Sequence, residues 1–217
     1  MNKLTSFLID EQQAHRKGGL YHKTQVQLAY NSNRIEGSKL TEEQTRYIFE
    51  TRTIGFKDQE AVPVDDIIET TNHFVAFDYL LRNIEEPLTE GIIKEFHRIL
   101  KTGTADAQKS YFNVGDYKQL ANEVGGRETS KPADVAKEMK SLQEWYHAQK
   151  DVTIHTLAEY HWRFESIHPF RTAMDVLAVS SSSVSAYVTA SYPSSLTMST
   201  RCTTIEASPN LSKHLAS

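Results

Sequence analysis

The octapeptide Phe-Glu-Ser-Ile-His-Pro-Phe-Arg, residues 164–171, is the most informative part of this chain. The imidazole of His168 is neutral near pH 7 and can then accept a proton from a hydroxyl group. Pro169 disfavours a helical conformation at the residue before it. We therefore predict that a helix ends before His168, that His168 is extended, and that its ring projects from a loop which Phe170 anchors in the core. This makes His168 a candidate general base.

The residues before this octapeptide have a mainly helical pattern, in which apolar side chains recur every three or four positions. Short helix-start and helix-stop signals separate the periodic segments. Thr41 with Gln44 matches a capping box, Gly55 closes that helix, and Thr89 is a predicted N-cap. Helices are predicted at 20–35, from 41 to about 55, from 63 to about 81, from 89 to about 99, from 132 to about 145, and at 153–167.

Residues 111–126 differ from the rest, because glycine, asparagine and aromatic residues replace the helical pattern. Such a composition is typical of extended segments and turns. The fold class is therefore predicted as mainly α with a small β-hairpin.

Length and charge limit the classes of function. The chain has 217 residues, a net charge of −4 and a pI near 6.1, which gives no electrostatic case for nucleic acid or an anionic membrane as a partner. No apolar run is long enough to span a bilayer, and the N-terminus lacks a signal-peptide core, so we expect a cytoplasmic protein. The one cysteine, Cys202, excludes a disulfide framework.

The octapeptide resembles the first half of the active-site motif of Fic (Fido) domains. That motif reads His-Pro-Phe, one or two variable residues including an acid, then Gly-Asn-Gly-Arg. The second half is missing from this sequence, where the residues after Arg171 are Thr172, Ala173, Met174, Asp175 and Val176.

The genetic code offers an explanation for the break. If one G was lost after the codon of Arg171, the restored G and the AC of the Thr172 codon spell Asp. In that frame the next codons permit Gly and Asn, force a second Gly across Met174 and Asp175, and permit Arg. The recovered string is His-Pro-Phe-Arg-Asp-Gly-Asn-Gly-Arg-Val-Gly-Arg, a complete family signature. We interpret the break as a frameshift; a genuine divergent tail is the alternative.

The composition of residues 172–217 also changes. They hold four charged side chains of Lys, Arg, Asp or Glu among eighteen Ser and Thr. Such a segment buries little apolar surface to offset its ordering entropy, so we expect an aberrant, poorly ordered tail. The predicted organisation is an N-terminal helical region at 1–87, an incomplete Fic core at 88–171, and this tail.

The resemblance implies a helical bundle with a hairpin flap and an activity, transfer of AMP from ATP to a Ser, Thr or Tyr hydroxyl of a target protein. His168 would be the base. In the family an acid holds Mg²⁺, a Gly-Asn-Gly turn binds the phosphates, and an Arg steadies their charge. Thr172 and Val176 occupy the positions of the acid and the Arg, so the chain as written is expected to be inactive.

Two further segments fit the same family. Ser32, Glu36 and Gly37 match its inhibitory helix motif, in which the Glu pairs with a second Arg of the signature. Val179 stands at that Arg position, so Glu36 is expected to lack a charge partner. Residues Glu123, Val124, Gly125 and Gly126 match a flap that holds the target segment by strand addition.

Other interpretations remain open. A non-catalytic pseudoenzyme or binding module would keep the flap, and related enzymes transfer phosphocholine, UMP or phosphate, or remove AMP. His155, His161 and His168 lack the acidic or cysteine companion of a zinc pattern, so no metal site is predicted from them. The sequence is compatible with a homo-oligomer.

Overall fold

The computed structural model describes residues 3–55 and 61–171 of the chain. Thr172, Val176, Val179 and the rest of the Ser/Thr-rich tail, for which predictions are given, lie outside these residues. The described part is mainly helical with one two-stranded antiparallel sheet, which confirms the predicted fold class. The elements are α1 (Lys3–Gln13), α2 (Leu20–Ile35), α3 (Glu42–Thr51), α4 (Val64–Arg82), α5 (Glu90–Lys101), a 3-10 turn (Asp106–Gln108), β1 (Glu123–Val124), β2 (Arg127–Glu128), α6 (Pro132–His147) and α7 (Ile154–Ile167).

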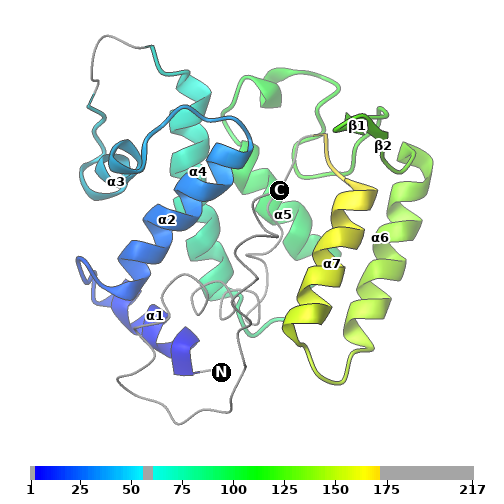
Figure 1. The fold of residues 1–217 in the computed structure, drawn as a ribbon, viewed down its shortest axis with the longest axis horizontal. Helices are drawn as coiled ribbons and strands as arrows, with labels where there is room; N and C mark the ends of the chain where they lie inside the picture. The colour runs from blue at the N-terminus through cyan, green and yellow to red at the C-terminus, as the bar shows by residue number, and fades with distance from the viewer. Residues whose placement is uncertain (1–2, 56–60, 172–217) are drawn as a thin grey trace.

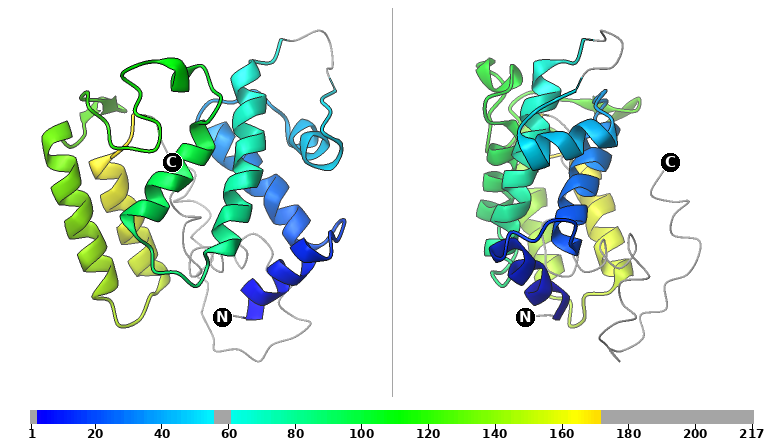
Figure 2. Two further views of the ribbon diagram at one scale, coloured as in Figure 1. Left: turned by 180° about the vertical axis from the view of Figure 1, so that it is seen from behind. Right: turned by 90° about the vertical axis from the view of Figure 1, so that its left-hand side faces the viewer.

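Helix α5 lies at the centre of the described structure. In Figure 1, α2, α3 and α4 lie on one side of α5, and the pair α6 and α7 lies on the other. The reverse view in Figure 2 shows the same order, with α5 between α4 and α7. The hairpin β1–β2 lies beside the C-terminal end of α7, where the octapeptide ends. The flap segment and the His168 loop are therefore neighbours in space.

The core forms where α4, α5, α6 and α7 meet. Its most deeply buried large side chains include Phe77 and Leu81 of α4, Ile93 of α5 and Met139 of α6. Phe164 joins them from α7, and Phe170 does so from the loop that follows. Within the described residues no helix is both long and apolar enough to cross a membrane.

The predicted helix starts are confirmed. The hydroxyl of Thr41 accepts a hydrogen bond from the main-chain amide of Gln44 at 3.1 Å. The side-chain oxygen of Gln44 accepts one from the main-chain amide of Thr41, which completes a capping box. Thr89 caps α5, and Pro132 begins α6. Helix α1 was not predicted, because its buried face is largely polar and includes Thr5 and Glu11.

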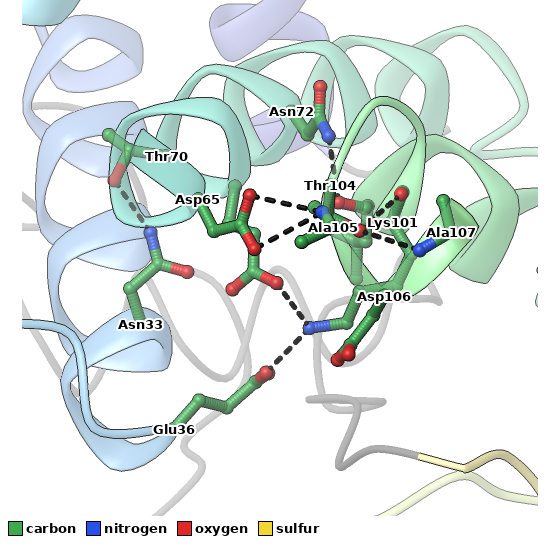
Figure 3. A network of polar contacts seen from close by, with 12 residues as sticks. Asn33, Glu36, Asp65, Thr70, Asn72, Lys101, Thr104, Ala105, Asp106 and Ala107 are labelled. Atoms are coloured by element: carbon green, nitrogen blue, oxygen red, sulfur yellow. Dashed lines mark hydrogen bonds and ion pairs between the residues drawn. The ribbon is translucent and has the colours of Figure 1, made fainter. Parts of the chain in front are cut away.

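A buried ion cluster joins the end of α2 to α4 and α5 (Figure 3). The Nζ of Lys101 lies 2.9 Å from a carboxylate oxygen of Glu36 and 2.9 Å from one of Glu69. Burial disfavours the Lys101 ammonium, but the two carboxylates outweigh this, and the pKa of Lys101 is raised. The expectation that Glu36 lacks a charge partner is therefore wrong. Its partner is 65 residues away in sequence, which no local pattern reveals.

We predict that Lys101→Met destabilises the protein by about 3 kcal/mol, because it removes the cation that the half-buried carboxylates of Glu36 and Glu69 share. Urea unfolding followed by circular dichroism measures this loss. The matched control is the triple variant Lys101→Met, Glu36→Gln, Glu69→Gln, which removes all three charges together and should be more stable than Lys101→Met alone. A triple variant as unstable as the single one, or less stable, would show that uncompensated charge is not the cause.

Candidate active site

His168 ends helix α7 in a left-handed conformation. Its φ and ψ are 45° and 68°, and its amide donates a hydrogen bond to the Phe164 carbonyl at 2.8 Å. The helix ends where predicted, but the prediction of an extended His168 is wrong. The hydrogen bond to Phe164 closes the helix with a left-handed cap, and this overrides the preference that Pro169 imposes. A non-glycine residue in this region costs about 1–3 kcal/mol, so the surrounding contacts must hold it there.

Phe170 supplies one of these contacts, as predicted. Its side chain is buried and stacks on the ring of His97, with centroids 4.0 Å apart and planes 15° apart. The Nδ1 of His97 accepts a hydrogen bond from the Gly115 amide at 3.0 Å. Burial lowers the pKa of His97 to about 3, so this ring stays neutral and packs as an aromatic side chain.

The second contact is made by the segment before the hairpin. The amide of Lys118 donates to the Pro169 carbonyl at 2.8 Å, and the guanidinium of Arg171 donates to the Ala121 carbonyl at 2.8 Å. These bonds lie on either side of Phe170. The loop 168–171 is therefore fastened both to the core and to residues 118–121.

His168 is 5 % exposed, so its ring is buried at the start of the loop, whereas the prediction was that the ring projects from the loop. Its Nδ1 lies 2.7 Å from the amide nitrogen of Asn122 and 3.0 Å from the Phe170 carbonyl oxygen. Burial lowers the pKa of His168 below its ordinary value; the Phe170 carbonyl opposes this shift, and the charge of Lys118 adds to it. The ring is therefore neutral at pH 7, which is the state that a general base requires.

Lys118 is a buried cation next to this ring. Its Nζ donates to Oδ1 of Asn122 at 2.7 Å, to Oγ1 of Thr129 at 2.6 Å and to the Ile167 carbonyl at 3.1 Å. Burial lowers the pKa of Lys118 to about 8. Lys118, Asn122 and Thr129 were not predicted from the sequence, because a lysine, an amide and a hydroxyl in a polar loop have no distinctive spacing.

The flap prediction is confirmed as a hairpin. Glu123 pairs with Glu128 and Val124 with Arg127, and all four residues are exposed. The turn residues Gly125 and Gly126 have φ of 58° and 78°, a conformation that favours glycine and suits a tight two-residue hairpin. The hairpin begins directly after Asn122, so the strand is continuous with the residue that contacts His168.

A groove of about 420 Å³ lies beside the hairpin and the His168 loop. Its lining residues come from the 3-10 turn and the segment after it, from the start of the flap, and from Arg171: Asp106, Lys109, Tyr111, Phe112, Ala121, Asn122, Glu123 and Arg171. Asn122 lines the groove and also contacts His168. The groove and the candidate base are therefore connected through Asn122.

The predicted inhibitory residues lie at the end of α2. Ser32 is buried, Glu36 is the C-cap residue, and Gly37 has a φ of 97°. Of these three residues, Glu36 contacts Lys101 of α5 (Figure 3). Within residues 3–55 and 61–171, no group of three His, Cys, Asp or Glu side chains is placed to hold a metal ion.

Part of the chain is similar to a known protein family. Residues 87–173 match the Fic/DOC family. Proteins named protein adenylyltransferase Fic from Drosophila yakuba and Drosophila melanogaster are each 29% identical over 151 residues, which is 65% of this chain and 28% of theirs. The chain thus spans little more than a quarter of the length of these relatives.

Solved structures share the fold. A Fic domain containing signaling protein from Bacteroides thetaiotaomicron is 24% identical with a TM-score of 0.60, over 78% of this chain and 66% of its own. A Fic family protein from Desulfovibrio desulfuricans G20 is 19% identical with a TM-score of 0.57, over 80% of this chain and 54% of its own. Fic-1 from C. elegans is 20% identical with a TM-score of 0.53, over 79% and 52%. Residues 87–173, which include the hairpin and the His-Pro-Phe loop, thus match the Fic/DOC family, and the helical fold is the one found in solved Fic domain structures.

Proposed function

We propose that residues 20–171 belong to an autoinhibited protein adenylyltransferase and that His168 is its general base. The hydroxyl oxygen of a target Ser, Thr or Tyr attacks the α-phosphorus of ATP, the bond to pyrophosphate breaks, and His168 accepts the hydroxyl proton. The observation that carries the proposal is the neutral imidazole of His168, fixed at the end of α7 and in contact with Asn122, which lines a groove. The names of the curated relatives support the same reaction.

The phosphate-binding half of the site does not fit this chain as written. The family acid that holds Mg²⁺ corresponds to Thr172, whose hydroxyl is a poor substitute for a carboxylate ligand. We therefore derive no step through the metal. The match to the family also ends at residue 173, two residues beyond Arg171. This coincidence supports a lost base in the coding sequence, and it supports an inactive product.

We propose that the flap binds the target protein. Glu123 and Val124 form an exposed strand at the edge of the two-stranded sheet, so their free main-chain groups can pair with an extended segment. The groove beside Asn122 would then receive the side chain that carries the hydroxyl.

A binding module without catalysis is the second candidate. The hairpin, the groove and the fastened loop are all formed by residues up to 171, so capture of a segment does not require the missing half of the signature. This function would survive the break after Arg171.

Labelling with α-labelled ATP tests the proposal. We expect the restored chain, in which Asp-Gly-Asn-Gly-Arg and the following reading frame are recovered, to label proteins of a lysate in the presence of Mg²⁺. The chain as written should label them at least 10²-fold less, because the loss of one oxyanion donor alone costs about 10²–10³ in rate. His168→Ala in the restored chain should lose about 10²–10⁴ of the rate, the share of a general base.

Equal labelling by the restored chain and its His168→Ala variant would contradict the role of His168. If both the native and the restored chain are silent, yet the native chain retains a partner that Glu123→Pro releases, the binding module is the correct function, because proline removes a main-chain donor from the flap strand.

We predict that Glu36→Gly raises labelling by the restored chain, because the carboxylate that the family uses to block the γ-phosphate is gone. Glu69→Gln is the matched control, since it loses a contact to the same Lys101 ammonium but lies outside the inhibitory motif. A rise in both variants would assign the effect to the loss of a Lys101 contact, and no rise in either would show that Glu36 does not inhibit.

A further inference from the structure

The side chain of Asn122 has its orientation fixed by a cation. The ammonium of Lys118 can only donate hydrogen bonds, and its three acceptors are Oδ1 of Asn122, Oγ1 of Thr129 and the Ile167 carbonyl. The Thr129 hydroxyl also donates to Oδ1 of Asn122. With Oδ1 held on this side, the amide NH₂ of Asn122 must face His168 and the Phe170 carbonyl.

This orientation selects a form of the His168 ring. A neutral imidazole carries one proton, so Nδ1 either accepts or donates. If Nδ1 accepts from Asn122 at 2.7 Å, the ring proton is on Nε2, and Nε2 cannot take a proton from a hydroxyl. If Nδ1 instead donates to the Phe170 carbonyl at 3.0 Å, Nε2 has a free lone pair and can act as a base.

We propose that Lys118 is a positioning residue that, acting through Asn122, selects between these two tautomers of His168. Charged Lys118 holds the form protonated on Nε2, and neutral Lys118 permits the base-competent form protonated on Nδ1. The role of the Nδ1-protonated form as a base rests on the proposed function. The choice between the two tautomers does not.

When Lys118 loses its charge, Asn122 can exchange its hydrogen-bond partners. A neutral amine can accept a hydrogen bond, so the Asn122 amide can turn, with its NH₂ toward Lys118 and its oxygen toward Nδ1–H of His168. The Lys118 proton goes to solvent. The ring releases one proton from Nε2 to solvent and takes one at Nδ1, so the charge of the ring is unchanged.

Groups on several elements affect the charge of Lys118. Burial by the surrounding chain is the largest effect and lowers its pKa to about 8; Glu138 of α6 opposes this shift, and Arg171 of the His168 loop adds to it. Thr129 at the flap side, the Ile167 carbonyl at the end of α7 and Asn122 face it with uncharged groups. A shift of tautomer is therefore expected between about pH 7 and about pH 9.5.

Nitrogen NMR of the full chain with ¹⁵N-labelled histidine tests the proposal without any substrate, because protonated and unprotonated ring nitrogens have well-separated shifts. The signals of His168 are assigned by their loss in His168→Gln. We expect the unprotonated nitrogen to be Nδ1 near pH 7 and Nε2 near pH 9.5, so the tautomer ratio inverts. One tautomer at both pH values would overturn the proposal.

Two variants separate Lys118 from other titrating groups. Lys118→Arg keeps a permanent charge, so the Nε2–H form should persist near pH 9.5. Asn122→Asp presents only acceptor oxygens to the ring, so the Nδ1–H form should already dominate near pH 7. A change of tautomer with pH in Lys118→Arg would overturn the proposal. The pH comparison on the unmodified chain decides it even if a variant does not fold, and a clear inversion with no labelling by the restored chain would reject the proposed function alone.

Discussion

The fastening of residues 168–171 is the constraint on which the site depends. His168 sits in a left-handed conformation that is unfavourable for a side-chain-bearing residue, and nothing in its own sequence favours that state. The main-chain bond from His168 to Phe164 and the bond from Lys118 to Pro169 hold the backbone on both sides. Burial of Phe170 against His97 fixes the loop to the core. With these contacts in place, the ring of His168 has a defined position before any ligand arrives.

The same contacts give the loop 118–129 two roles. Its main chain forms the two flap strands, and its Asn122 side chain, held by Lys118, contacts the candidate base. The flap strands and the residue that contacts His168 therefore belong to one short segment of the chain. Under the proposed function, a target segment that shifted this loop would also change the hydrogen-bond partners of the His168 ring.

Local features of the fold were predictable from the sequence, and long-range pairings were not. Thr41, Thr89 and Pro132 mark helix starts through bonds and backbone angles within one turn, so their signals are visible in a few residues. The predicted hairpin at Gly125 and Gly126 is similarly local. Helix α1 was missed because its buried face is polar.

The candidate site shows the same difference between local features and long-range contacts. His168 and Phe170 were found from the octapeptide, but the left-handed cap was missed because a tertiary network outweighs the local effect of proline. The Lys118 contact to Ile167 spans 49 residues and the Lys101 contact to Glu36 spans 65. Each joins an ordinary surface-type residue to a distant partner, so only the folded chain reveals that these lysines are buried.

Hydrogen exchange of the main-chain amides tests the fastening of the loop most directly. The amides of His168 and Lys118 close the loop onto α7 and onto the flap segment. If the loop is built as described, both amides exchange about as slowly as those of the core helices α5 and α7, since they open only with the surrounding structure. Exchange of both amides at the rate of an unstructured peptide in an otherwise protected protein would contradict a preformed site at His168.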